Sequence, residues 1–301
     1  MKDTNQTRCG FIAVVGAPNA GKSTFVNHMV GAHVAIVTPK VQTTRNKILG
    51  IALHNNSQLV FIDTPGVFNA KERFEEAMVK AALGSANDAD IIMLIVDAYK
   101  GICDNTKMVI EALKDRNAHK IVVINKIDKV DKTLLPKLAE SIFAMDEFQA
   151  CFMISASKGK GTEDVKSYLA QHVPCDSWHY PEEQISDAPM RQIAAEITRE
   201  SLFMRLKQEL PYSVAVDTES WEEKSDGSIK ISQVVYVRTE GQKKIVIGDK
   251  GAMLRDIGKS ARHKLRELTG RGVHLFLFVK VAEKWKDNKE FFENIGLEYK
   301  P

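Results

Sequence analysis

The stretch Gly16-Ala17-Pro18-Asn19-Ala20-Gly21-Lys22-Ser23 decides the fold. It follows an apolar run at 11–15 and precedes a helical pattern, which is the setting of a phosphate-binding loop. In such a loop the glycines let the backbone wrap closely around phosphate groups, so that successive N–H groups and the helix N-terminus face the anion. We expect Lys22 to place its charge on the β and γ phosphates and the Ser23 hydroxyl to bind Mg²⁺.

Working outward from this loop, polar motifs end three further apolar runs. Asp63-Thr64-Pro65-Gly66 follows the run 58–62. Asp63 is therefore placed to hold Mg²⁺ through water, and the Gly66 N–H to meet the γ-phosphate.

The other two motifs predict which base is bound. In Asn125-Lys126-Ile127-Asp128, the Asp128 carboxylate offers a fixed pair of acceptors, which guanine matches with two N–H donors on one edge. Adenine would leave that carboxylate unpaired. Ser155-Ala156-Ser157 ends another run and brings a backbone N–H toward the guanine oxygen. The predicted nucleotide contacts are Gly16, Ala17, Pro18, Asn19, Ala20, Gly21, Lys22, Ser23, Thr24, Asp63, Thr64, Pro65, Gly66, Asn125, Lys126, Asp128, Ser155 and Ala156.

The polar segment 38–45 lies between the phosphate loop and Asp63 and has no helical or strand periodicity. We expect it to order around Mg²⁺ and the γ-phosphate, with Thr44 or Thr43 as a metal ligand. The residue after Gly66, where many small GTPases carry a glutamine that orients the attacking water, is Val67. Intrinsic hydrolysis should therefore be slow, and no residue is assigned as the catalytic base. Lys40 and Arg45 are candidates for supplying positive charge to the transition state of hydrolysis. The other interpretation is that both side chains are simply solvated on the surface.

Apolar runs alternate with helical stretches through residues 8–173, which predicts an α/β domain with a mixed, mostly parallel sheet covered by helices on both faces. The runs 91–96 and 121–124 are continuously apolar, as strands buried on both faces are. Prolines among polar residues mark 174–189 as a linker. Beyond it, helical spacing over 190–210 and 254–268 and strand patterns near 214–216, 229–237 and 273–281 predict an α+β domain at 190–283. Residues 284–301 remain as a C-terminal tail or helix.

The net charge of +3 is unevenly distributed. Residues 1–189 carry 21 basic and 22 acidic side chains, and residues 190–301 carry 21 and 17. The excess is concentrated in 241–272, where nine basic residues face three acidic ones, a pattern that suits a polyanion or a solvated helix face. The polar N-terminus, the lack of a run of roughly 20 apolar residues and four widely spaced cysteines predict a cytoplasmic protein with reduced, structural cysteines. We expect it to be a monomer.

The five N-terminal motifs resemble those of the Era family, bacterial GTPases of small-subunit ribosome assembly. The likeness rests on residues 16–24, 42–45, 63–66, 125–128 and 155–157. It implies that Thr44, directly before an arginine, is the Mg²⁺ ligand, which gives a metal set of Ser23, Thr44 and Asp63. The apolar Val67 is also a family trait. In some relatives an asparagine at the position of Asn19 holds a K⁺ ion, which we carry over as a hypothesis.

The C-terminal domain resembles a type II KH domain, because Ile245-Val246-Ile247-Gly248-Asp249-Lys250-Gly251 matches a GxxG loop between two helices. The glycines would let two helix ends approach a nucleotide backbone closely. The Asp249 carboxylate opposes phosphate, so we expect weaker non-specific binding. The predicted RNA-binding residues are Gly248, Asp249, Lys250, Gly251, Lys243, Lys244, Arg255, Lys259 and Arg262.

The resemblance implies a switch that binds GTP, GDP and Mg²⁺ and hydrolyses GTP. Its implied partners are the 3′ end of 16S rRNA and the 30S subunit. The resemblance also implies peripheral association with the inner membrane. Two other readings stay open. One is an enzyme acting with a partner, such as a tRNA-modification GTPase, and the other has a C-terminal domain that binds protein.

Overall fold

The computed structural model describes residues 6–40, 44, 48–68, 73–114, 116 and 118–282. The predicted tail at 284–301 lies outside these residues. By their contacts, the described residues form two compact units: unit 1 contains residues up to Ala35 and from Thr44 to Asp187, and unit 2 contains Ile36–Lys40 and the chain from Ala188 onward. No helix within the described ranges combines the length and apolar content that crossing a bilayer requires.

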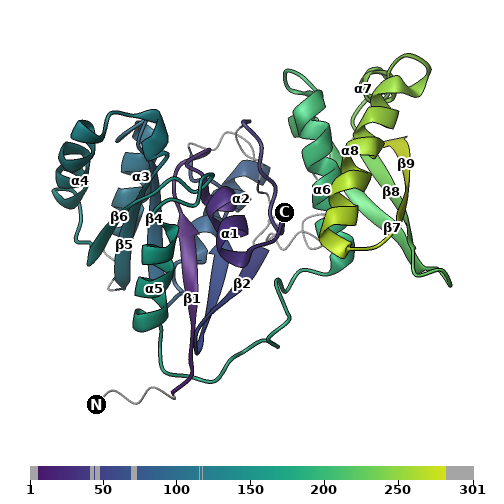
Figure 1. The fold of residues 1–301 in the computed structure, drawn as a ribbon. Helices are drawn as coiled ribbons and strands as arrows, with labels where there is room; N and C mark the ends of the chain where they lie inside the picture. Colours follow the sequence, from purple (N-terminus) through teal and green to yellow (C-terminus); the bar gives the residue numbers. More distant parts are fainter. Residues whose placement is uncertain are drawn as a thin grey trace. The chain divides into compact units, whose positions relative to one another are not determined.

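Unit 1 is built on a six-stranded sheet in the order β2-β3-β1-β4-β5-β6 (Figure 1). Strand β2 runs antiparallel to β3, and the remaining pairs are parallel. The carboxyl ends of the parallel strands therefore meet at one edge, where the predicted motifs begin. The strands are β1 Arg8–Val15, β2 Ile48–His54, β3 Ser57–Asp63, β4 Ile91–Asp97, β5 His119–Asn125 and β6 Ala150–Met153.

Helices cover both faces of this sheet, because successive strand residues point to opposite sides. Ile12 and Val14 face a core shared with α1 (Lys22–Val30) and α5 (Thr162–His172). Ala13 and Val15 face a second core, which receives side chains from α3 (Asp104–Leu113) and α4 (Leu135–Phe143) and from the end of α2 (Arg73–Gly84). The mixed sheet with helices on both faces is the architecture that the sequence predicts.

The segment predicted as a linker contributes to unit 1. The Ile185 carbonyl accepts from the Ile51 N–H (2.9 Å), and the Ser186 hydroxyl donates to the Leu49 carbonyl (2.7 Å). Trp178 and Tyr180 pack against apolar residues of β2 and β3. The start of 174–187 therefore bonds to β1 and β3, through the Cys9 N–H and the Gln58 side chain, and only its last three residues bond to β2.

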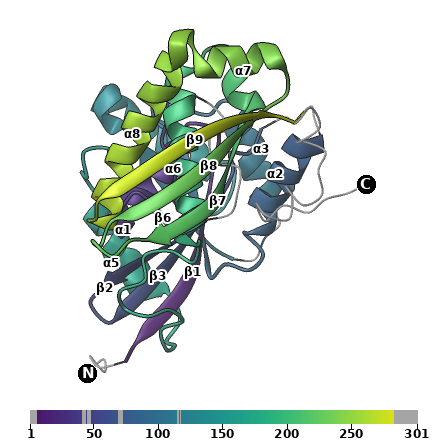
Figure 2. The same cartoon turned by 90° about the vertical axis from the view of Figure 1, so that its right-hand side faces the viewer.

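Unit 2 has a three-stranded sheet in the order β7-β8-β9, with β7 and β8 antiparallel and β8 and β9 parallel (Figure 2). The parallel pair needs a crossover, which α7 and α8 supply. Two apolar clusters join the helices to one face of the sheet. The elements are α6 Met190–Arg205, β7 Ala215–Glu223, β8 Ile229–Val237, α7 Glu240–Ile247, α8 Ala252–Thr269 and β9 Val273–Val281.

Helix α6 is shorter than its leucine spacing predicts. It ends at Arg205, and Leu206 has an extended backbone (ψ 150°). Leu206 and Leu210 nevertheless belong to the same apolar cluster as Leu202. The spacing of four thus reports a shared core and does not by itself extend the helix to residue 210.

The short segment Ile36–Lys40 belongs to unit 2 although it lies far from the rest of that unit in sequence. The Val37 N–H donates to Glu200 Oε1 (3.3 Å), and Lys40 Nζ donates to the carbonyls of Phe203 and Leu206. Glu200 is buried and also pairs with Lys264 Nζ (2.8 Å). The first half of the polar segment 38–45 is therefore held by helix α6.

Candidate nucleotide and RNA sites

The phosphate loop connects β1 to α1 and approaches the backbone of β4. Gly16 has φ 154°, and a Cβ atom there would lie 2.4 Å from the Ile95 carbonyl oxygen, so only glycine fits. Gly21 precedes α1 in the left-handed region (φ 100°). The N-terminus of α1 thus opens directly from the loop, as anion binding requires.

Lys22 is folded back onto this loop. Its Nζ donates to the carbonyls of Gly16 and Ala17, each at 3.1 Å, and the side chain is almost fully buried. Burial lowers the pKa of Lys22 to about 8, and the charge of Asp63 opposes that shift. The ammonium is therefore mostly charged at neutral pH and lies where phosphate oxygens would compete for its hydrogen bonds.

Three predicted metal ligands lie together at the end of β3. Ser23 Oγ donates to Asp63 Oδ2 (2.7 Å), and Thr44 Oγ1 lies 2.9 Å from Ser23 Oγ and 3.4 Å from Asp63 Oδ2. Asp63 is fully buried, and among the described residues its Oδ1 has no hydrogen-bond partner. Burial raises the pKa of Asp63 to about 6, partly offset by the Ser23 hydrogen bond and the Lys22 charge.

An unsatisfied carboxylate oxygen beside two hydroxyls fits a hard divalent cation, since Mg²⁺ takes oxygen ligands and would stabilise the buried charge. Thr44 meets this cluster as the family resemblance implies. Thr43, Arg45 and Gln42 lie outside the described residues. Lys40, an alternative source of transition-state charge, instead donates to carbonyls of α6 and the residue after it.

The turn after Asp63 packs tightly on the phosphate loop. A Cβ atom on Gly66 would lie 2.9 Å from Pro18 Cα, and the Val67 N–H donates to the Gly16 carbonyl (3.2 Å). The Val67 side chain is fully buried in the apolar core beneath. An apolar, buried side chain has no group that could orient a water molecule.

The Asn125 side chain ties the base-recognition motif to the phosphate loop. Its Nδ2 donates to the Ala20 carbonyl (2.9 Å), and its Oδ1 accepts from the N–H groups of Ala156 (3.0 Å) and Lys126 (2.8 Å). The predicted Asn125, Lys126 and Ala156 are thus brought together. In this structure the Ala156 N–H serves to orient Asn125.

Asp128 lies at the rim of the same site. Its Oδ1 accepts from Ser155 Oγ (2.7 Å), and its Oδ2 lies 3.4 Å from Lys158 Nζ. The Ser155 hydrogen bond lowers the pKa of Asp128, so the carboxylate is charged at neutral pH. An ionised acceptor pair is what recognition of the guanine edge needs.

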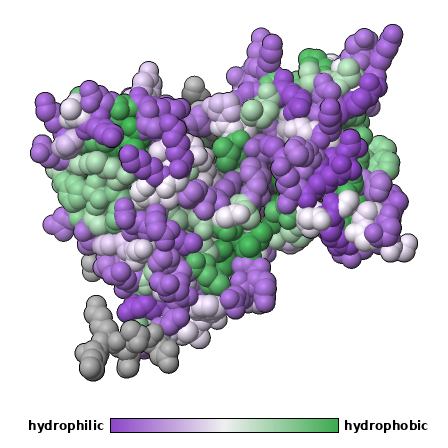
Figure 3. Space-filling model, in the orientation of Figure 1, coloured by the Kyte–Doolittle hydropathy of each residue, from purple (hydrophilic) through white to green (hydrophobic). Residues whose placement is uncertain are grey.

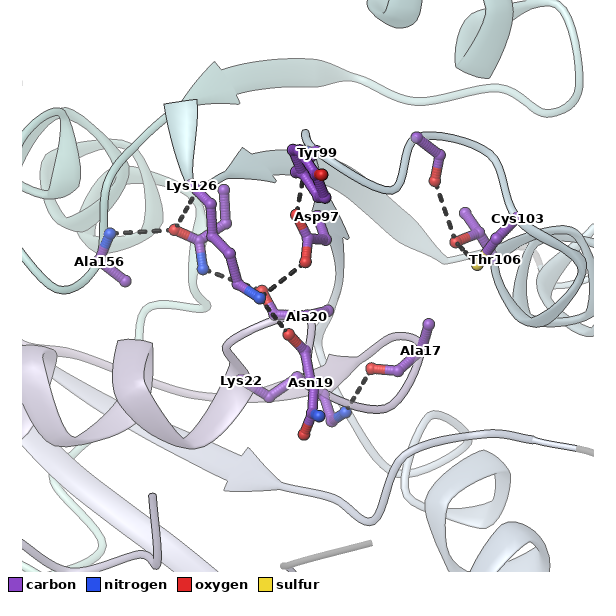
Figure 4. Close-up of polar contacts among 12 residues, drawn as sticks. Ala17, Asn19, Ala20, Lys22, Asp97, Tyr99, Cys103, Thr106, Lys126 and Ala156 are labelled. Atoms are coloured by element: carbon purple, nitrogen blue, oxygen red, sulfur yellow. Dashed lines mark hydrogen bonds and ion pairs between the residues drawn. The ribbon is translucent and has the colours of Figure 1, made fainter. Parts of the chain in front are cut away.

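The prediction omitted one acidic residue of this edge. Asp97 ends β4 and is only 6% exposed, and its Oδ2 accepts from Lys126 Nζ at 2.7 Å (Figure 4). The rule that selected Asp63 and Asn125, a polar residue at the carboxyl end of a buried strand, also selects Asp97.

In unit 2, the loop Gly248–Gly251 joins α7 to α8. Gly248 has φ 73°, and a Cβ atom there would lie 2.6 Å from Met253 Cβ. Lys250 also adopts a left-handed conformation (φ 46°), and both Asp249 and Lys250 are exposed. The two helix ends therefore meet at a solvent-facing loop whose backbone a ligand can reach.

Ion pairs divide the basic residues of 241–272 into two groups. Three of the nine pair with carboxylates: Lys243 with Glu240, Lys264 with Glu200 and Arg271 with Glu223. Within the part of the chain that the structure describes, the other six form no ion pair, and hydrophilic side chains gather over α7 and the adjoining end of α8 (Figure 3). These six, called the basic stripe below, are Lys244, Lys250, Arg255, Lys259, Arg262 and Arg266.

An apolar side chain that the prediction did not single out lies beside this loop. Ile245 is 58% exposed, whereas Val246 is fully buried in the core. On a helix, adjacent residues point about 100° apart, so the run Ile245-Val246-Ile247 cannot be buried throughout. An exposed isoleucine next to cations offers a surface on which a nucleic-acid base can pack.

Comparison with known proteins assigns both units to families. Residues 11–126 match the model described as 50S ribosome-binding GTPase, and residues 209–286 match the KH domain model. GTPase Era of Brucella suis biovar 1 is 51% identical over 297 residues, which cover 99% of this chain and 96% of that protein. GTPase Era of Sinorhizobium medicae is 52% identical over 97% of this chain and 94% of that protein.

The chain belongs to the Era family of GTPases. The fold class, the GTPase activity and the resemblance inferred from the motifs are confirmed. A crystal structure of Era in complex with MgGDPNP and nucleotides 1506–1542 of 16S ribosomal RNA has a TM-score of 0.90 and 36% identity, and it covers 96% of this chain and 99% of that one. A variant of Aquifex aeolicus Era bound to GDP.AlF4⁻ has a TM-score of 0.91 and 35% identity over the same shares.

Proposed function

We propose that this Era-family GTPase binds the 3′ end of 16S rRNA through unit 2 and acts in assembly of the 30S subunit. The observation that carries the proposal is the loop Gly248–Gly251, exposed between two helix ends and flanked by the cations of the basic stripe. The relative solved with 16S ribosomal RNA supports the choice of RNA. We propose that the protein acts in the cytoplasm, and the family resemblance adds peripheral association with the inner membrane as a hypothesis.

The geometry of unit 1 suits binding and hydrolysis of GTP. We propose that Ser23, Thr44 and Asp63 hold Mg²⁺, directly or through water, and that the cation neutralises charge on the phosphates. Lys22 would exchange its two loop carbonyls for phosphate oxygens. The Asp128 carboxylate, oriented by Ser155, would accept from the guanine edge.

Val67 is apolar and buried, so the residue at this position cannot act as a general base or orient the attacking water. We therefore propose slow intrinsic hydrolysis, with positioning and charge as the main contributions. The K⁺ site at Asn19 is a hypothesis taken from the family resemblance. In the structure, the Asn19 main-chain carbonyl accepts a hydrogen bond from Lys126 Nζ.

RNA binding by unit 2 would combine three features on one surface. The helix ends at Gly248 and Gly251 let N–H groups approach the backbone of about four nucleotides. The basic stripe supplies phosphate neutralisation, and Ile245 supplies an apolar contact for a base. Asp249 adds a carboxylate that disfavours non-specific phosphate contacts.

The test compares the two glycines that flank α8, because both have a left-handed backbone and open space around the Cα atom. Gly251 precedes the helix and Gly270 follows it, both have positive φ (78° and 64°), and a Cβ atom at either would meet nothing within 4 Å. Gly251→Asp and Gly270→Asp therefore impose similar backbone strain, but only Gly251→Asp puts a carboxylate into the loop. The measurement is affinity for a single-stranded RNA matching the 3′ end of 16S rRNA, at several salt concentrations.

We expect Gly251→Asp to weaken RNA binding at least tenfold and Gly270→Asp to leave it within about twofold. Adding Gly248→Asp should abolish binding, and GTP binding should persist in all three variants. RNA stimulation of GTP hydrolysis, where the parent shows it, should disappear with RNA binding. Equal RNA affinity for the parent and Gly251→Asp, or an affinity independent of salt, would favour a protein-binding role for unit 2.

A further inference from the structure

Asp97 occupies a fixed place at the nucleotide edge of the sheet. It is the last residue of β4, between the phosphate loop that follows β1 and the Asn125 motif that follows β5. One carboxylate oxygen accepts from Lys126 Nζ (2.7 Å), and the other accepts from the Tyr99 N–H (3.0 Å). Both oxygens are thus engaged, and the side chain is 7% exposed.

Lys126 links this carboxylate to the phosphate loop. Its Nζ also donates to the Asn19 carbonyl at 2.5 Å, as Figure 4 shows. Both Lys126 and Asn19 have left-handed backbones (φ 65° and 62°), so the chain is strained at each end of this contact. The Asn125 amide makes the adjacent bond to the Ala20 carbonyl (2.9 Å).

The carboxylate limits where the Lys126 ammonium can go. A lysine side chain has four rotatable bonds, and ordering it costs on the order of 1.5–2 kcal/mol of conformational entropy. The Asn19 carbonyl is a single neutral acceptor, whereas Asp97 supplies a full opposite charge in a mostly buried position. Asp97 therefore keeps Lys126 across the loop before any nucleotide arrives.

We propose that Asp97 is a positioning residue for guanine nucleotides. It acts through Lys126, which in turn holds the phosphate loop at Asn19 in its binding conformation. The inference rests on nucleotide binding at the site described above and is independent of the RNA proposal. Since neither contact involves the γ-phosphate position, GTP and GDP affinity should depend on Asp97 equally.

The test measures binding of fluorescently labelled GDP, and of GTP by competition, to the full chain. Asp97→Asn keeps the shape of the side chain and an acceptor for the Tyr99 N–H but removes the charge. We expect both affinities to fall about tenfold, the difference between a charge-assisted and a neutral hydrogen bond. The turnover number at saturating GTP should change less than twofold. Asp88→Asn makes the same chemical change at an exposed residue and should leave affinity unchanged.

Lys126→Met separates positioning from a merely structural role. It removes the ammonium and leaves Asp97 buried without its cation, so both nucleotide affinity and the thermal midpoint should fall. Adding Asp97→Asn to Lys126→Met should restore the midpoint while nucleotide affinity stays at the level of Lys126→Met. The proposal is overturned if Asp97→Asn binds GDP as the parent does, or if the double variant loses affinity by the product of the two single losses.

Discussion

Replacing Asp63 with asparagine should make the nucleotide-free protein more stable while removing its response to Mg²⁺. The carboxyl is fully buried, and its pKa is raised from 3.8 to about 6. Below pH 3.8 it is protonated in both the folded and unfolded states and costs nothing. Between pH 3.8 and about 6 the unfolded state binds fewer protons than the folded state, so stability is lost as pH rises through this range and levels off above it.

A shift from 3.8 to about 6 corresponds to a penalty of about 3 kcal/mol at pH 7.5 and roughly half of that at pH 5. Asp63→Asn removes this penalty but also removes the charge that raises the pKa of Lys22, which offsets part of the gain. We therefore expect a net gain of about 2 kcal/mol at pH 7.5 and about 1 kcal/mol at pH 5.

The assay is urea unfolding of the nucleotide-free protein, in the presence of a chelator, at both pH values. The transition that belongs to unit 1 is identified beforehand as the one whose urea midpoint rises when GDP is added. In parallel, GTP affinity is measured with and without Mg²⁺, and only the parent should respond to the metal. Asp88→Asn serves as the exposed control. A variant that is less stable than the parent at pH 7.5, or one whose GTP affinity still rises with Mg²⁺, would refute the assignment of Asp63 as a metal ligand whose buried charge destabilises the metal-free protein.

Two other predictions concern the same unit. Asp128→Asn should lower GTP affinity by roughly 10- to 100-fold and admit xanthosine triphosphate, whose C2 carbonyl can accept from the new amide; unchanged GTP binding in a titration would contradict the base assignment. Ser23→Ala and Thr44→Ala should each weaken Mg²⁺-dependent GTP binding, with Thr44→Ala affecting GTP more than GDP. If Thr43→Ala shows that nucleotide-state dependence and Thr44→Ala does not, the register of the metal ligand is wrong by one residue.

Much of the nucleotide site follows from sequence because its parts are local. Each motif follows the carboxyl end of a strand, and parallel strands bring those ends to one edge whatever lies between them. Asn125 and Ala156 are 31 residues apart yet bonded at 3.0 Å for this reason. Asp97 ends its strand in the same way, but it lies outside the five motifs, and its partner is a side chain that only the fold reveals.

The features that escaped prediction depend on tertiary contacts. Leucine spacing indicates that Leu206 and Leu210 face the core but not that the helix ends at Arg205. Lys264 is one of the nine basic residues of 241–272, yet buried Glu200 pairs with it. Proline content predicts a linker at 174–189 but not the hydrogen bonds that attach it to β1, β2 and β3.

The position of Ile36–Lys40 in unit 2 has a consequence for the order in which the protein is made. Val37 precedes its acceptor Glu200 by 163 residues, so it leaves the ribosome long before α6 exists. Unit 1 can form its sheet as it is synthesised, because domains fold from the N-terminus during translation. The chain beside Thr44 reaches its final contacts only after α6 of unit 2 has been made, so a nascent chain stopped before residue 190 has a phosphate loop but lacks the helix that anchors this segment.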